Sequence, residues 1–252
     1  AYTSYAKAFK QLGLDVGTEL VETAVSAHYR QGGVRVDTAT MASSVVGLFV
    51  AGGVAGHSNG LIGLVTYDGK LAAEAVARYM ESKGYSSIPD ERMAVEQERL
   101  EALLRPPGRN GLSPMRVKNA IREIMWQDVG VEKSATGMAR ALDGLERIRT
   151  EVLPGMGLAN RTRRFNHAWA DAIDVYNMLD ACTLTIHSAL NRKESRGPFI
   201  RTDYPDMDNE NWLAQNILVP GRGGDVAFIT QRYDSPQLRP GFDRKDNLSV
   251  EW

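Results

Sequence analysis

The stretch that decides the fold class is "SPMRVKNAIREIMWQDVG", residues 113–130. Its apolar residues recur at helical spacing and form one stripe, which runs through Val117, Ala120, Ile121, Ile124 and Met125. Ser113 stands at the N-cap position and Pro114 at the first helical position, where each residue type is favoured. The pattern predicts an amphipathic helix with one buried face.

Neighbouring segments repeat this pattern. "SATGMARALDGLERIRTEVLPG" (134–155) has Ser134 as its expected cap, and a longer helix is expected from Arg161 to Leu190. An acidic start at residues 89–91 and the double proline at 106–107 delimit a further helix. Adjoining apolar stripes are best buried against one another, so residues 86–252 are expected to form a helical bundle domain with a β-rich tail.

Strand patterns flank the helical region. Residues 213–219 and 226–231, joined by "PGRGGD", predict a β hairpin, and a short edge strand is expected after residue 197. Before residue 85 we expect a buried strand at 48–51, a glycine loop, and a helix over 64–84 that ends at Gly84. The predicted fold class is α+β, with the end of an α/β domain in residues 1–85.

Composition excludes several classes of protein. The chain has 252 residues, 43% hydrophobic and 24% charged, with a formal net charge of −1. That balance gives no electrostatic field toward nucleic acid, and no apolar run is long enough to span a bilayer. The single cysteine excludes an internal disulfide and a multi-cysteine metal site. It is compatible with a reducing compartment, and a cytoplasmic location is expected.

Two glycine-rich segments are the candidate ligand-binding regions. "AHYRQGGVRVD" (27–37) places His28 and Arg30 before the pair Gly32–Gly33. "GLFVAGGVAGHSNG" (47–60) carries Gly52, Gly53, His57, Asn59 and Gly60 between an expected strand and a helix. Loops at such positions bind phosphates and cofactors, although this one lacks the complete dinucleotide-binding spacing. For each histidine a purely structural role remains an alternative, and we expect no metal site.

In chain order, these motifs resemble the succinate dehydrogenase and fumarate reductase flavoproteins. "AHYRQGGVRVD" resembles the Ala-His-Tyr-x-x-Gly-Gly signature of that family, and "NRKESRGPFIRTDYPDMDNENWL" (191–213) resembles its Glu-Ser-Arg-Gly and Arg-x-Asp-Tyr-Pro segment. The family binds FAD in an N-terminal domain that precedes the first of these motifs. The resemblance therefore implies that this chain is the C-terminal half of an FAD-dependent oxidoreductase.

The resemblance also implies roles for individual residues. His28 would contact substrate, Arg30 would supply a neighbouring charge, and Gly32 and Gly33 would lie near the flavin ring. The loop from Gly52 to Gly60, including Gly53, His57 and Asn59, would approach the ribityl and phosphate end of the cofactor. The partners implied are an N-terminal FAD-binding polypeptide, an iron–sulfur or other electron-transfer subunit, and a small-molecule substrate.

Two departures from the family pattern stand out. The family's ribityl-binding glutamate is replaced by Gly53, and the arginine that clamps a dicarboxylate is absent from "HSNGLIGLVTYDG" (57–69). A bidentate arginine contributes strongly to carboxylate binding, so succinate and fumarate are not the expected substrates. Two alternatives stay open: a non-catalytic scaffold that docks a flavin-binding or electron-transfer subunit, and membership of the adenylylsulfate reductase branch.

Overall fold

The fold is described from a computed structural model, which describes residues 2–19, 32–57, 61–84, 87–221 and 225–232. The chain divides into two compact units, Ala1–Ser86 and Ser87–Trp252. We call these the first unit and the second unit and describe each by itself.

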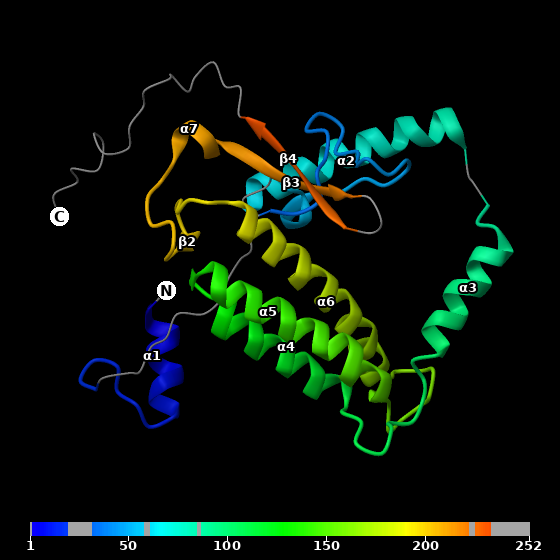
Figure 1. Cartoon of the computed structure of the whole chain (residues 1–252), viewed down its shortest axis with the longest axis horizontal. Coiled ribbons are helices and arrows are strands. Elements are labelled where there is room, and N and C mark those ends of the chain that lie inside the picture. The colour runs from blue at the N-terminus through cyan, green and yellow to red at the C-terminus, as the bar shows by residue number, and fades with distance from the viewer. Residues whose placement is uncertain (1, 20–31, 58–60, 85–86, 222–224, 233–252) are drawn as a thin grey trace. The chain divides into compact units, whose positions relative to one another are not determined.

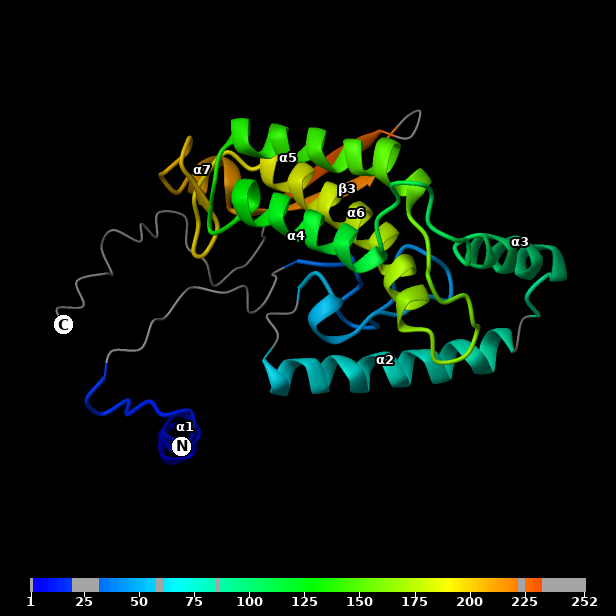
Figure 2. The same ribbon diagram turned by 90° about the horizontal axis from the view of Figure 1, so that it is seen from below.

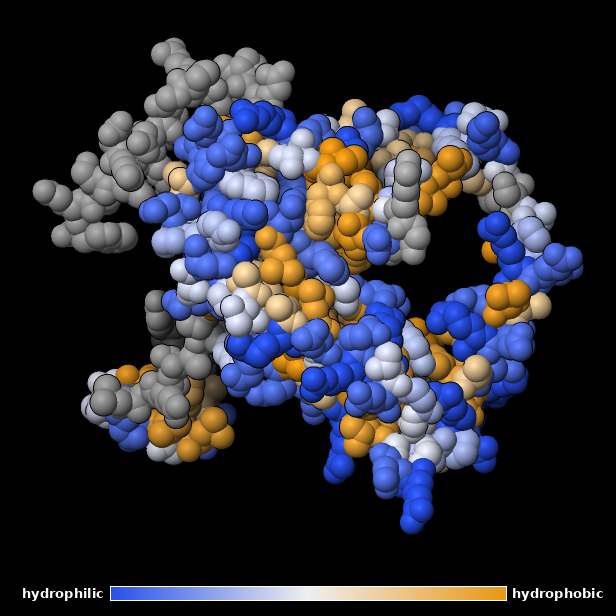
Figure 3. All heavy atoms as spheres, in the orientation of Figure 1, coloured by the Kyte–Doolittle hydropathy of each residue, from blue (hydrophilic) through white to orange (hydrophobic). Residues whose placement is uncertain are grey.

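The first unit contains two α-helices and a short 3-10 turn. Helix α1 spans Tyr2–Gln11, the 3-10 turn η1 spans Gly52–Val54, and helix α2 spans Ile62–Lys83. The segment that follows α1 exposes Leu12, Leu14 and Val16, and Figure 3 shows hydrophobic surface at this end of the chain. Helix α2 ends at the predicted residue, because Gly84 adopts a positive φ of 66° and its N–H donates to the carbonyl of Met80.

The strand predicted at 48–51 is wrong. Leu48 is 46% exposed, and Phe49 makes only an isolated antiparallel bridge to Ala42. Asp37 explains the local geometry, because its side chain accepts hydrogen bonds from the N–H groups of Ala39 and Thr40 and closes a turn. The chain in this part of the unit therefore forms isolated bridges rather than a regular sheet.

The second unit is built on three packed helices. Helix α4 spans Pro114–Val129, α5 spans Ala135–Arg147 and α6 spans His167–Asn191. Figures 1 and 2 show these three helices side by side in both views. Helix α3, Asp90–Glu101, precedes them, and a π turn, Ile148–Val152, and a 3-10 turn, Leu153–Gly155, follow α5. The predicted bundle is confirmed.

The predicted apolar stripes form the core of this bundle. Each helix contributes side chains that are almost fully buried, namely Val117, Ile121, Met138, Ala141, Leu145, Ala172, Val175, Leu179 and Ile186. The predicted cap of α5 is also confirmed, because the Ser134 side chain accepts a hydrogen bond from the N–H of Gly137. Ser113 precedes α4 as expected but makes no side-chain capping bond.

Helix α6 begins later than its pattern predicts. Asn166 caps it, accepting a hydrogen bond from the N–H of Trp169 and donating to the carbonyls of Asn160 and Thr162. Those side-chain bonds hold residues 160–166 in a loop, in which Phe165 has a positive φ of 51°. Local polar bonds therefore compete with helical geometry over the first residues of the expected helix.

Two small sheets complete the second unit. Strand β1, Glu132–Lys133, pairs in parallel with β2, Ile200–Arg201. After helix α7, Asn209–Trp212, strands β3, Ala214–Pro220, and β4, Val226–Arg232, form the predicted antiparallel hairpin.

The hairpin is fastened to α6 by side-chain amides. Asn216 on β3 donates to the carbonyl of Ser188 at 2.8 Å, and Asn191 donates to the side-chain oxygen of Asn216, also at 2.8 Å. These bonds fix the hairpin along the last turns of α6, as Figure 1 shows. Among the described helices, none is both long and apolar enough to cross a membrane.

Replacing Leu179 by alanine is expected to destabilise the second unit. Its side chain is 0% exposed in the bundle core, and truncation of such a residue costs about 2–5 kcal/mol of unfolding free energy. Leu184→Ala on the same helix, where the side chain is 46% exposed, is the matched control and should cost less than about 1 kcal/mol. Urea unfolding followed by circular dichroism measures both, and equal losses would contradict the assigned core.

Candidate functional site

Two predicted glycine segments meet in the first unit. The N–H of Val34 donates to the carbonyl of Val54 at 2.8 Å, and the N–H of Gly56 donates to the carbonyl of Val34 at 2.8 Å. These bonds form a parallel bridge between Val34 and Ala55. The structure therefore brings residues 32–34 beside residues 52–57, which are about twenty positions further along the sequence.

Gly33 is required by this close approach. A Cβ atom at this position would lie 2.1 Å from the carbonyl oxygen of Val54 and 2.7 Å from its carbonyl carbon. Both atoms belong to the backbone, so neither can move aside by changing a rotamer. The absence of a side chain at Gly33 thus has a packing cause within the chain itself.

Gly32, Gly52 and Gly53 have different surroundings. Gly32 and Gly52 have positive φ values of 97° and 76°, a conformation that glycine adopts without strain. A Cβ at Gly32 would meet no atom within 4 Å, and Gly53 is exposed. The backbone at Gly32 and Gly53 is therefore open to a neighbouring molecule.

His57 follows this loop and contacts helix α2. Its Nε2 atom lies 3.2 Å from Oδ1 of Asp68, whose side chain is only 5% exposed, whereas the His57 side chain is 28% exposed. Sequence reasoning missed Asp68, because a separation of eleven residues between a loop and a helix carries no periodic signal. An aspartate on the otherwise apolar early part of α2 was the available clue.

The remaining predicted site residues are not described. His28 and Arg30, the predicted catalytic residues, and Asn59 and Gly60, predicted to bind cofactor, lie outside the described residues. Those four assignments remain predictions. In the described part of the chain, no group of three or more histidine, cysteine, aspartate or glutamate side chains is placed to hold a metal ion.

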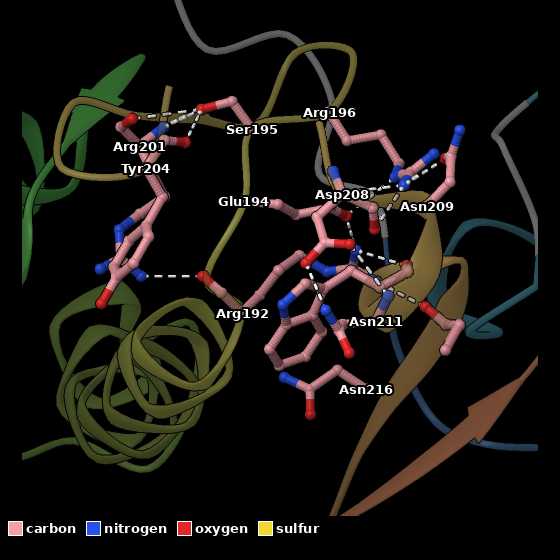
Figure 4. Close-up of polar contacts among 12 residues, drawn as sticks. Arg192, Glu194, Ser195, Arg196, Arg201, Tyr204, Asp208, Asn209, Asn211 and Asn216 are labelled. Atoms are coloured by element: carbon pink, nitrogen blue, oxygen red, sulfur yellow. Dashed lines mark hydrogen bonds and ion pairs between the residues drawn. The ribbon is translucent and has the colours of Figure 1, made fainter. Parts of the chain in front are cut away.

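A second cluster of polar residues lies after α6, between Arg192 and Asn216 (Figure 4). At its centre Glu194 is fully buried. Arg196 donates to both of its carboxylate oxygens at 2.8 and 2.9 Å, and Arg192 donates to Oε1. The N–H of Asp208 also donates to Oε2 at 2.9 Å, so each oxygen has protein partners.

Arg201 organises the other half of this cluster. Its guanidinium group is 1% exposed and donates to both oxygens of Asp203, at 2.8 and 2.7 Å, and to the carbonyls of Ala189 and Arg192. Asp203 also accepts a hydrogen bond from the N–H of Ala135 at the start of α5. The hydrogen bonds from Arg201 lower the pKa of Asp203 to about 2.

The two clusters differ in what they leave available. Arg192, Arg196 and Arg201 are engaged with carboxylates and carbonyls of the same unit, so this cluster joins the end of α6 to β2, α7 and β3 (Figure 4). The expectation that the basic residues near 192–197 pair with carboxylates is confirmed. The candidate ligand-binding site is accordingly the glycine segment with His57 and Asp68, which we call the glycine site: residues 32–34, 52–57 and Asp68.

Comparison with known proteins identifies close relatives. Residues 118–240 match the family model described as fumarate reductase flavoprotein C-term. The fumarate reductase flavoprotein subunit of Mycobacterium tuberculosis is 28% identical over 81% of this chain, and a fumarate reductase (CoM/CoB) chain of Methanothermobacter marburgensis is 31% identical over 83%. The chain spans only 37% and 38% of the lengths of these two relatives.

A solved structure agrees with these matches. The Mycobacterium smegmatis Sdh1 complex in its apo form superimposes with a TM-score of 0.81 and 27% sequence identity. The alignment covers 93% of this chain and 41% of the solved chain. The likeness therefore extends over nearly all of this chain and less than half of the solved one.

Gly33→Ala is expected to separate the two glycine segments. The added methyl group would displace the Val54 carbonyl and break two backbone hydrogen bonds, which together contribute about 2 kcal/mol. Gly63→Ala is the control, because a Cβ there meets no atom within 4 Å on helix α2, and it should stabilise by up to about 1 kcal/mol. Hydrogen exchange at the Val34 and Gly56 amides measures the effect, and unchanged protection in Gly33→Ala would contradict it.

Asp203→Asn is expected to flatten the acid side of the stability profile. Because the pKa of Asp203 is lowered from 3.8 to about 2, its stabilising contribution is complete above about pH 4 and is lost as pH falls toward 2. Its side chain is 30% exposed, so solvent screening limits that contribution to about 1 kcal/mol. Chemical unfolding at several pH values measures the slope; the exposed Asp206→Asn is the control, and equal slopes in wild type and Asp203→Asn would contradict the assignment.

Proposed function

We propose that this chain, which is the C-terminal region of a flavoprotein of the succinate dehydrogenase and fumarate reductase family, forms one wall of an FAD-dependent oxidoreductase. Its named relatives are fumarate reductase flavoprotein subunits. In the proposed protein an N-terminal FAD-binding polypeptide holds most of the cofactor, and residues 1–85 complete that domain. FAD supplies the two-electron step by accepting or donating hydride.

The packing of the first unit supports a missing neighbour. Among its described residues, the buried hydrophobic side chains are Met41, Ala55 and Ala75. Large apolar side chains are instead exposed along residues 34–67: Val34, Val45, Val46, Leu48, Val54, Leu61, Ile62, Leu64 and Tyr67. Extensive exposed apolar surface marks an interaction site, and the relatives contain more than half their length outside the matched region.

The glycine site is compatible with a large planar cofactor. Gly33 allows the two segments to approach, while Gly32 and Gly53 leave open backbone where a side chain would otherwise project. Backbone N–H groups at such positions can donate to carbonyl or phosphate oxygens. We propose that Gly32, Gly33, Gly52, Gly53, His57, Asn59 and Gly60 contact FAD, with His28 and Arg30 facing the substrate.

The proposed substrate is a small molecule that carries less negative charge than succinate. The resemblance places glycine at position 53, where the family has a glutamate, and provides no arginine in residues 57–69 to clamp a dicarboxylate. A bidentate arginine is the side chain best suited to that task. Electrons would leave through an iron–sulfur or other electron-transfer subunit, in a reducing compartment such as the cytoplasm.

A visible spectrum of the protein isolated from its natural source tests this function. We expect the chain to co-purify with an FAD-binding polypeptide and to show the flavin absorption band, with FAD released on denaturation. Arg140→Ala, which removes an ion pair with Asp128 on the exposed surface of the second unit, is the control and should leave flavin content unchanged. Isolation of the wild-type chain with neither flavin nor a flavoprotein partner would refute the proposal.

A further inference from the structure

A buried carboxylate lies behind a partly exposed imidazole in the first unit. Asp68 is on helix α2 and its side chain is 5% exposed, while His57 lies beyond η1 with a side chain that is 28% exposed. The atoms in contact are Nε2 of His57 and Oδ1 of Asp68, at 3.2 Å. Because an ionised carboxylate only accepts hydrogen bonds, Nε2 is the nitrogen that carries the proton in this pair.

This contact determines what the other ring nitrogen can do. With Nε2 protonated and facing Asp68, neutral His57 keeps its lone pair on Nδ1. Within the described part of the chain, Nδ1 has no hydrogen-bond partner. The nitrogen is therefore able to accept a proton, and the resulting imidazolium would be stabilised by the carboxylate beside it.

The second oxygen of Asp68 points to the same role. Oδ2 is buried and has no hydrogen-bond partner in the described residues, unlike Glu194, whose two oxygens both accept hydrogen bonds. Leaving a buried acceptor unsatisfied costs about 1–3 kcal/mol. A positive charge on His57 would offset part of that cost, so the pair is built to favour a proton arriving at the imidazole.

We propose that His57 is the proton-transfer residue of the glycine site and that Asp68 is its positioning residue. This inference rests on the proposed function, in which FAD is the oxidant. The substrate C–H bond breaks with its electron pair, which leaves as hydride to FAD. The adjacent X–H bond, where X is carbon, nitrogen or oxygen, breaks heterolytically; its proton goes to Nδ1 of His57 and its electron pair forms the new C=X bond.

The charge of the pair defines the class of substrate. An imidazolium beside a carboxylate has no net charge, so the pair gives no clamp for a dicarboxylate. It suits a substrate that is uncharged around the reacting bond, such as a saturated ketone that becomes an enone or a secondary alcohol. In the reverse direction protonated His57 donates its proton to the carbon next to the one that receives hydride.

The first test examines the pair without any turnover. Long-range proton–nitrogen NMR of the full chain reports which nitrogen of His57 is protonated. We expect a single Nε2–H tautomer in the wild type and a mixture of tautomers in Asp68→Asn, in which the amide group can also donate to Nε2. Glu74→Gln, which replaces an exposed carboxylate on α2, is the matched control. The same tautomer distribution in wild type and Asp68→Asn would overturn the positioning role.

The second test uses the flavin-loaded protein with its FAD-binding polypeptide. Reduced flavin is re-oxidised by 2-cyclohexenone as the uncharged probe, with fumarate as the dicarboxylate probe, and absorbance of the flavin is followed in a stopped-flow instrument. We expect His57→Gln to slow re-oxidation by the enone about 10²–10⁴-fold, with flavin content unchanged. Added imidazole should restore part of the rate in His57→Ala, which a purely structural role would not allow.

The controls separate the two proposals. His167→Gln changes an exposed histidine at the start of α6 and should leave the rate unchanged. Equal enone rates in wild type and His57→Gln, with flavin retained in both, would overturn the proton-transfer role alone. Failure of the wild-type protein to hold flavin would overturn the proposed function, and the NMR result would then decide whether Asp68 orients His57.

Discussion

The backbone at Gly33 passes so close to the carbonyl of Val54 that a side chain of any size would collide with it. This approach, with hydrogen bonds from Val34 and Gly56, fixes where residues 52–57 lie relative to residues 32–34. Position 57 follows directly, and the histidine there reaches Asp68 on α2. The geometry of the glycine site therefore depends on one residue that has no side chain.

The two units of the chain are stabilised in different ways. The second unit buries a continuous set of apolar side chains from α4, α5 and α6, and a carboxylate–guanidinium network around Glu194 and Arg201 closes one end of it. The first unit buries few apolar side chains among its described residues and exposes many. Such a surface is stabilised when another protein segment covers it, and this is the physical basis for proposing an FAD-binding neighbour.

The sequence predicted those features that depend on local chemistry. Ser134 and Gly84 stand at helix ends where a hydroxyl and a positive φ satisfy backbone groups, and the hairpin over 214–232 follows from alternation around a glycine-rich turn. The strand at 48–51 and the first residues of α6 were not predictable, because the Asp37 turn and the Asn166 side-chain bonds override the apolar pattern. Gly33 was singled out correctly as a close backbone approach, whereas the pairing of His57 with Asp68 depends on tertiary structure.

Hydrogen exchange of the chain, measured alone and with its FAD-binding polypeptide and FAD, tests the central claim most directly. The account predicts that the added protection falls on the first unit, at amides of residues 32–57 and the beginning of α2, while amides in α4, α5 and α6 keep their existing rates. Protection that is unchanged in the first unit, or that increases only in the second, would contradict the claim that this chain completes a flavin-binding wall.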